Sequence, residues 1–437
     1  MTDYLPAIIA VAVTAFAVVS KRLGKSAVTG TMVFTALGLV VGPEVFDLVD
    51  FGGLLGQPEF VRLVLTGTLI VVLFADASAI NASRWSDDVV AARLLGIGLP
   101  LAMAFGWLAA LVLLGDLEVW EAAVLAAMLA PTDAALGKAV VSNPRVPARI
   151  RQALNIESGL NDGIVLPFFI VFLETARAAE ASLDLVDLVD LVTELVADIG
   201  IALAIGVAVG ALGARAVRWG RTSGFASPYW LQIALLSLAV AAYAIATPLG
   251  GSGFIAAWVA GLVFGRNNRA AHDTDGSLLE FSEIVGDLLT MISFFVFGVY
   301  LGPVLTEVTW QIVAYGVISL AVVRLVAVVI AVTGEHMRRS TVLYMGWFGP
   351  RGLATIILTI EIIDTSDLDH AVMIASTALF TVGLSVLAHG LTAWWGSNAY
   401  ADAVEAHPDG DDLMETTPTS LDVRVPLRSR HPHLPDR

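Results

Sequence analysis

The sequence predicts an all-α polytopic membrane protein with about 13 transmembrane helices. The 437-residue chain is 57% hydrophobic and only 15% charged, a balance that a soluble domain of this length does not need. Apolar stretches of about 18 or more residues recur along the chain, and each is long enough to cross a bilayer core of about 30 Å as a helix. Because these stretches are continuously apolar, whereas barrel strands alternate polar and apolar residues, helices are favoured over a barrel.

The predicted spans fill residues 1–400, which we assign to one transmembrane domain. The first span lacks a basic stretch before it and a small-residue cleavage site after it, so we expect a retained helix rather than a signal peptide. Residues 401–437 are rich in proline and charge and predict a disordered cytoplasmic tail. The spans are about 5–20, 27–44, 61–80, 92–114, 120–142, 156–175, 192–217, 228–247, 251–265, 281–301, 310–332, 341–363 and 371–396.

The positions of Lys and Arg predict how the chain is oriented in the membrane. Loops that follow the odd-numbered spans carry fifteen basic residues, and the alternate loops carry two. Basic loops face the cytoplasm, which predicts a plasma-membrane protein with its N-terminus outside and its C-terminus inside. The formal net charge of -16 argues against nucleic acid as a partner. The chain has no cysteine, so it holds neither a disulfide nor a thiolate metal site.

Charged residues within the predicted spans are the candidate functional groups, because a charge near the bilayer centre costs about 2.5–3.5 kcal/mol on insertion. The segment "NIESGLND", residues 155–162, places Glu157 four residues before Asn161, and Ser158 four residues before Asp162. Residues four apart lie on one helical face, so two neighbouring polar stripes result. We interpret Asp162 as a transport group, and Glu157 with Arg324 as a buried structural ion pair.

Two of the spans contain helix-breaking residues. Pro131 interrupts "LAPTDAALG", and three Gly or Pro residues surround Arg351 in "FGPRGLATI". Two interrupted spans in corresponding positions are typical of transporters built from inverted repeats, in which unwound carbonyls bind a cation. We expect Asp133 at one break and Arg351 at the other to neutralise the partial charges of the helix ends. Asp76, in "VVLFADASAIN", is either a cation ligand or a group at the entrance.

Two other classes of membrane protein fit the sequence less well. A cation channel would carry a short Gly-rich filter such as TVGYG, which the sequence lacks. A membrane-embedded enzyme would need a nucleophile with a base, or a metal cluster, inside the spans, and no such pattern is apparent. A transporter is therefore favoured over an enzyme.

These features resemble the monovalent cation/proton antiporters of the sodium/hydrogen exchanger type, and prokaryotic NhaP-like members most of all. The resemblance covers about residues 5–398 and is most specific in "APTDAALGKAVVSNPRVPARIRQALNIESGLNDGIVLP". Supporting matches are "VVRLVAVVI", "FGPRGLA" and "TVGLSVLAHGLTAWW". It implies exchange of Na+ (or Li+) for H+ by alternating access, without a cofactor, in a homodimer that contacts membrane lipid. Exchange of K+ for H+ on the same fold is the alternative.

The resemblance also implies roles for individual residues. Asp162 would bind cation and proton in competition, with Ser158 and Thr132 completing the Na+ site and Asp76 contributing from the third helix. Asn161 stands where electrogenic relatives have a second Asp, which implies one-for-one, electroneutral exchange. The supporting network would consist of Glu157 and Arg324, which hold Asn161, and of Asp133 and Arg351, which serve the crossing helices.

Overall fold

The computed structural model describes residues 4–23, 26–51, 59–80, 89–180, 185–267, 277–365, 368–406, 413 and 415. Within these ranges the regular structure is entirely helical. The helices before the first break are α1 Leu5–Leu23, α2 Gly30–Val41, α3 Glu59–Ala79, α4 Val89–Arg93, η3 Leu94–Gly98, α5 Leu99–Leu113 and α6 Val119–Met128. The middle of the chain forms α7 Ala134–Val141, α8 Ala148–Glu180, α9 Leu185–Thr222, α10 Pro228–Ala246, η4 Thr247–Leu249 and α11 Gly253–Asn267. The remaining helices are α13 Ser277–Thr306, α14 Trp310–Val317, η5 Ile318–Val323, α15 Arg324–Ala331, α16 Arg339–Trp347, α17 Leu353–Thr365 and α18 Ala371–Glu405.

Helices occupy every range that the sequence predicts to span the membrane. Among the described residues, nine helices are long and apolar enough to cross a bilayer, and three shorter apolar helices accompany them. The expected all-helical membrane fold is therefore confirmed, while the count of thirteen spans stays a prediction. Both predicted interruptions are present, because α6 and α7 are separate helices and so are α16 and α17.

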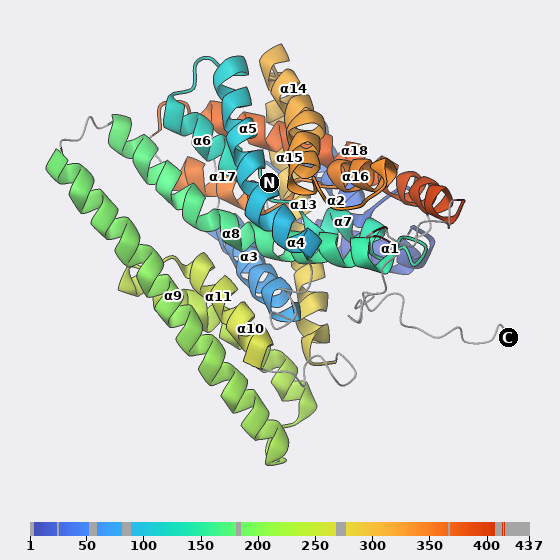
Figure 1. Cartoon of the computed structure of the whole chain (residues 1–437). Coiled ribbons are helices and arrows are strands. Elements are labelled where there is room, and N and C mark those ends of the chain that lie inside the picture. The colour runs from blue at the N-terminus through green and yellow to red at the C-terminus, as the bar shows by residue number, and fades with distance from the viewer. Residues whose placement is uncertain are drawn as a thin grey trace.

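The helices form two bundles on either side of α8. Helices α9, α10 and α11 pack together, and α11 also packs on α3, which contacts α13 and α2. On the other side, α5 packs on α6 and α14, and α16 and α17 contact α18. Figure 1 shows α9, α10 and α11 at the lower left, α5 and α14 at the top and α16 and α18 toward the right, with the long helix α8 running between the two groups.

Two short π-helical segments occur inside predicted spans, and the sequence pattern did not predict them. Segment η3 lies between α4 and α5, and η5 lies between α14 and α15. A π-helical turn shifts the phase of a helix, so residues after it face a new direction. Arg324 is the first residue after η5, so this segment contributes to the direction in which the Arg324 side chain points.

The C-terminal boundary of the folded part differs slightly from the expected one. Helix α18 continues to Glu405, five residues into the predicted tail. Beyond it, Glu415 is buried and accepts hydrogen bonds from the Arg338 N–H at 3.2 Å and the Thr341 hydroxyl at 3.1 Å. Most of the predicted tail lies outside the described residues, so its disorder stays a prediction.

Helices α2 and α13 touch backbone to backbone at a pair of glycines. A Cβ atom added to Gly38 would lie 2.0 Å from the Phe295 carbonyl oxygen, and one added to Gly298 would lie 2.2 Å from the Thr35 carbonyl oxygen. Small residues allow such close approach between helices inside a membrane. This crossing therefore depends on the absence of side chains at both positions.

We predict that Gly38→Ala destabilises the protein by about 1–3 kcal/mol, because the added methyl group meets a backbone atom that cannot move independently. Thermal unfolding in detergent measures the effect. The matched control is Gly67→Ala in α3, where an added Cβ meets no heavy atom within 4 Å. Equal stability of the two variants would contradict the predicted dependence on this crossing.

Candidate functional site

The two helix breaks lie against each other. The chain leaves the helical conformation at residues 129–133, which include Pro131, and again at residues 348–352. Across the contact, the Asp133 N–H donates to the Pro350 carbonyl oxygen at 2.7 Å. The breaks therefore form one unit, in which four helix ends meet inside the protein.

Arg351 is fully buried at this meeting point. Its Nη1 donates to the carbonyl oxygens of Ala130 and, at 2.9 Å, of Pro131. These carbonyls follow the C-terminal end of α6, where the helix dipole leaves partial negative charge and carbonyls lack helical partners. The cationic side chain of Arg351 neutralises this partial charge and donates the hydrogen bonds that the carbonyls lack.

Asp133 accepts hydrogen bonds at the N-terminal ends of α7 and α17, the two helices that begin after the breaks. Its Oδ1 accepts from the Leu136 N–H at 2.8 Å, at the start of α7, and its Oδ2 accepts from the Leu353 N–H at 2.6 Å, at the start of α17. A carboxylate is favourable at helix N-termini. A Cβ atom on Gly352 would lie 2.1 Å from Asp133 Oδ2, so the close approach requires glycine there.

Glu157 and Arg324 form a buried ion pair. Both guanidinium nitrogens of Arg324 donate to the carboxylate, and the Nη2–Oε2 distance is 2.8 Å. The side chains are only 2% and 3% exposed. Nη2 also approaches the Met345 carbonyl at 3.4 Å, and a Cβ on Gly349 would lie 2.5 Å from Arg324 Nε. The pair thus connects α8 and α15 with the end of α16.

Asn161 is completely buried and contacts the first break directly. Its Nδ2 donates to the Thr132 hydroxyl oxygen at 2.6 Å, while its Oδ1 has no hydrogen-bond partner among the described residues. The structure thus gives Asn161 a hydrogen bond to Thr132, while its support by Glu157 and Arg324, which the family resemblance implies, stays a prediction. A hydroxyl oxygen has two acceptor positions, so Thr132 keeps one for a further partner.

A cavity of the protein opens beside the first break and the first turns of α8. It brings together Thr132 and Ser158, two of the predicted ion ligands, with Asp133 and Glu157 of the predicted network. Asp162 and Asp76 are not part of its lining. The lining residues are Thr132, Asp133, Ala134, Gly137, Val140, Val141, Leu154, Asn155, Glu157, Ser158, Phe348 and Pro350.

Asp162 lies one helical turn beyond Ser158 on α8 and is partly exposed. It makes no hydrogen bond or ion pair with another described residue, but it interacts electrostatically with Asp133 and Asp76. Asp76 of α3 lies next to α8, because a Cβ on Gly159 would be 3.6 Å from the Asp76 Cβ. The structure thus gathers three carboxylates, from the first break, from α3 and from α8 itself. No described residue donates a hydrogen bond to Asp162.

Sequence reasoning did not single out three residues that stabilise the breaks. The Ser385 hydroxyl accepts from the Arg351 N–H at 2.7 Å, and His389 Nε2 lies 2.9 Å from the Trp347 carbonyl oxygen. The Thr355 hydroxyl donates to the Met128 carbonyl at 2.6 Å. Ser385 and His389 are four residues apart in a span without charged residues, and this spacing was the available indication of a polar face on α18.

The fold and the site define a class of protein. Two interrupted helices that meet inside a multi-span helical protein, with acidic side chains beside the breaks, are the architecture of secondary transporters. Residues 8–395 match the family described as "Sodium/hydrogen exchanger, transmembrane". The chain belongs to this family, which confirms the expectation of a transporter rather than an enzyme.

Individual relatives agree with this assignment. A probable Na+/H+ antiporter of Schizosaccharomyces pombe is 25% identical over 350 residues, which cover 74% of this chain and 44% of that protein. The K+/H+ antiporter NhaP of Alkalimonas amylolytica is 25% identical over 346 residues, 78% of this chain and 57% of that protein. An uncharacterised Na+/H+ exchanger of Mycobacterium tuberculosis is 34% identical over 163 residues, 35% of this chain and 29% of that protein. The chain thus spans 29% to 57% of the length of these relatives.

A solved structure shares the fold. The sodium proton antiporter MjNhaP1 from Methanocaldococcus jannaschii superimposes with a TM-score of 0.72 at 19% sequence identity, over 92% of this chain and 98% of that chain. The expected prokaryotic NhaP-like architecture is therefore confirmed at the level of the fold.

We predict that Glu157→Gln destabilises the protein by about 3–5 kcal/mol, because it leaves the buried guanidinium of Arg324 without a countercharge. The matched control is Glu174→Gln, which removes a partly exposed pair with Arg177 and should change stability by less than about 1 kcal/mol. Unfolding in detergent, followed for both variants, checks the difference. Equal losses would show that burial does not set the strength of the Glu157 pair.

Proposed function

We propose that this chain exchanges Na+ (or Li+) for H+ across the plasma membrane by alternating access, with Asp162 as the group that binds either ion. One observation carries the proposal. Asp162 is a carboxylate inside a membrane protein, and no described residue donates a hydrogen bond to it. Every other charged side chain described at the breaks has a hydrogen-bond or ion-pair partner. A carboxylate retained at such a cost is explained by the ions that it binds.

The surrounding oxygen atoms suit a hard monovalent cation. Ser158 is one turn below Asp162, and the Thr132 hydroxyl retains an acceptor position beside the cavity. Oxygen ligands of this kind hold hard cations. Na+ at Asp162, Ser158 and Thr132 would neutralise the Asp162 carboxylate, and so would a proton, so the two ions compete for it. Asp76 lies close enough to influence the approaching cation, because it interacts electrostatically with Asp162.

Counter-transport follows if the loaded site changes sides and the empty, negatively charged site does not. Because Na+ and H+ carry the same charge and use one carboxylate, each cycle exchanges one ion for one ion. Asn161 is neutral and hydrogen-bonded to Thr132, so it adds no second titrating group. The proposed exchange is therefore electroneutral and requires no cofactor.

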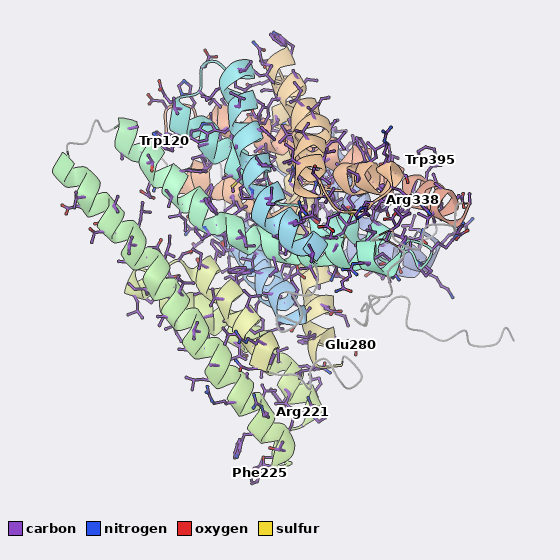
Figure 2. The ribbon with its side chains drawn as sticks, viewed as in Figure 1. Trp120, Arg221, Phe225, Glu280, Arg338 and Trp395 are labelled. Atoms are coloured by element: carbon purple, nitrogen blue, oxygen red, sulfur yellow. The ribbon has the colours of Figure 1, made fainter. Side chains whose placement is uncertain are left out.

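The arrangement in the membrane is part of the same proposal. Figure 2 shows Trp120 at the upper left, Arg221 and Glu280 toward the bottom, and Arg338 at the right. Arg221 and Arg338 belong to the basic loops, so we place the side that faces away from Trp120 in the cytoplasm, with the N-terminus outside and the C-terminus inside. The resemblance to known exchangers supports a homodimer in contact with lipid.

Exchange of K+ for H+ is the second candidate. It is favoured by the relative from Alkalimonas amylolytica, which is named as a K+/H+ antiporter and matches 78% of this chain. Collapse of a pH gradient in proteoliposomes, compared for Na+, K+ and Li+, separates the two candidates.

We predict that Asp162→Asn reduces exchange to the level of empty liposomes without unfolding the protein. The amide of Asn carries no negative charge, so a cation and a proton cannot compete for it. Gradient collapse measures transport, and size-exclusion chromatography checks folding. Asp116→Asn, at an exposed loop carboxylate, is the control and should retain exchange. Retained exchange in the Asp162 variant would overturn the assignment.

We predict that Asn161→Asp makes exchange sensitive to membrane voltage, because it adds a second carboxylate that can carry a proton through the cycle. Proteoliposomes with the voltage clamped and unclamped test this. An unaltered response to voltage, in a variant that still transports, would count against the role of Asn161 in setting the stoichiometry.

A further inference from the structure

The indole ring of Trp258, on α11, lies directly against the backbone of Gly163, on α8. A Cβ atom added to Gly163 would lie 2.2 Å from both Cδ2 and Cε2 of Trp258, and 2.3 Å from Cδ1. These three indole atoms are at nearly the same distance from the added Cβ, so the face of the ring covers Gly163. No other residue type fits at position 163 while the ring remains there.

The contact lies beside the ion site and away from the cavity. Gly163 directly follows Asp162, whereas the cavity reaches α8 only at residues up to Ser158. Five residues of α-helix rise about 7 Å, so the ring meets α8 about 7 Å beyond Ser158. Along α8, Asp162 is therefore placed between the cavity and the indole.

The contact joins α8 to the bundle that contains α3 and α11. Trp258 belongs to α11, which packs tightly on α3, because a Cβ on Gly261 would lie 2.5 Å from the Phe74 carbonyl oxygen. One turn before Gly163, Gly159 faces Ile80, the residue that follows α3, whose Cδ1 would lie 3.1 Å from an added Cβ. Helix α8 thus presents bare backbone to the α3 and α11 pair at two successive turns.

Packing alone holds the indole in place. Its Nε1 is buried and has no hydrogen-bond partner among the described residues, although a buried tryptophan N–H usually finds one. A contact made by shape, without a directional bond, can be broken and remade when the helix that it touches moves. A large apolar group in a narrow path also excludes water and ions.

We propose that Trp258 closes the ion path beyond Asp162: its ring, seated on Gly163, separates the ion site from the end of the protein opposite the cavity. The proposal rests on the alternating access proposed above. When α8 moves relative to α11, the ring leaves Gly163 and the path on that side opens. Trp258 is thus a positioning residue, which acts through closure rather than through contact with the reacting carboxylate.

Thiol labelling tests the closure without measuring transport. The chain has no cysteine, so Ser158→Cys introduces a single thiol in the cavity. A membrane-impermeant methanethiosulfonate is added, in Na+-free buffer, to either side of vesicles that contain protein of known orientation. We expect labelling from the side of Arg145, next to the start of α8, and protection from the opposite side.

Two variants disturb the contact, one by changing Trp258 and the other by changing Gly163. In the Ser158→Cys background, Trp258→Ala removes the ring and Gly163→Ala displaces it, so both should lose the protection from the opposite side. Trp258→Phe keeps an aromatic ring over Gly163 and should retain the protection. Trp107→Ala is the control, since it removes a partly buried indole that packs elsewhere, against the rings of Trp120 and Phe172.

One-sided labelling that persists in either disturbing variant, with the protein eluting as a single species, would overturn the proposal. Equal labelling from both sides, or from neither side, in the Ser158→Cys parent would overturn it as well. A separate readout is the Na+-independent proton leak through Trp258→Ala proteoliposomes, which should rise as closure is lost. Failure of the Asp162 assignment would appear only in the exchange assay, so the two proposals fail independently.

Discussion

The meeting of two interrupted helices is the constraint on which the rest of this structure depends. Helix ends inside a membrane protein leave backbone groups and partial charges that no water can satisfy. Arg351 satisfies the carbonyls that follow α6, and Asp133 satisfies the N–H groups at the starts of α7 and α17. Each charge is stabilised by helix ends, so the protein retains unwound backbone at a depth where it would otherwise be strongly unfavourable.

The charged groups around the breaks differ in whether the protein supplies their partners. Glu157 and Arg324 neutralise each other in a buried pair, and the uncharged Asn161 donates a hydrogen bond to Thr132. Among the charged groups described at the breaks, Asp162 alone makes neither a hydrogen bond nor an ion pair with the protein. In the function that we propose, a proton or a cation is the missing partner of this carboxylate, and exchange is a consequence of that incomplete environment.

Movement is compatible with this rigid centre because the contacts between the bundles differ from the contacts within them. Around the breaks, hydrogen bonds and ion pairs fix the helices in one arrangement. Between α8 and the α3 and α11 pair, glycine backbone meets apolar side chains, as at Gly159 and Gly163. Such contacts provide close packing without directional bonds, so one bundle can shift against the other at a smaller cost.

The helical membrane fold, the two breaks and the short list of candidate residues follow from the amino-acid sequence without the tertiary structure. Continuous apolar runs require helices, Pro131 and the residues around Arg351 interrupt them, and charges in those spans need a function or a partner. The pairing of Glu157 with Arg324 was a hypothesis from the sequence. The two residues are 167 positions apart, and only the tertiary fold shows that they are in contact. Sequence reasoning could not find the Asn161–Thr132 bond, the π-helical turn before Arg324, the Ser385 and His389 supports or the Trp258–Gly163 contact. These features depend on which helix faces which, and that choice is made by packing between distant segments, which the local pattern of apolar residues does not encode.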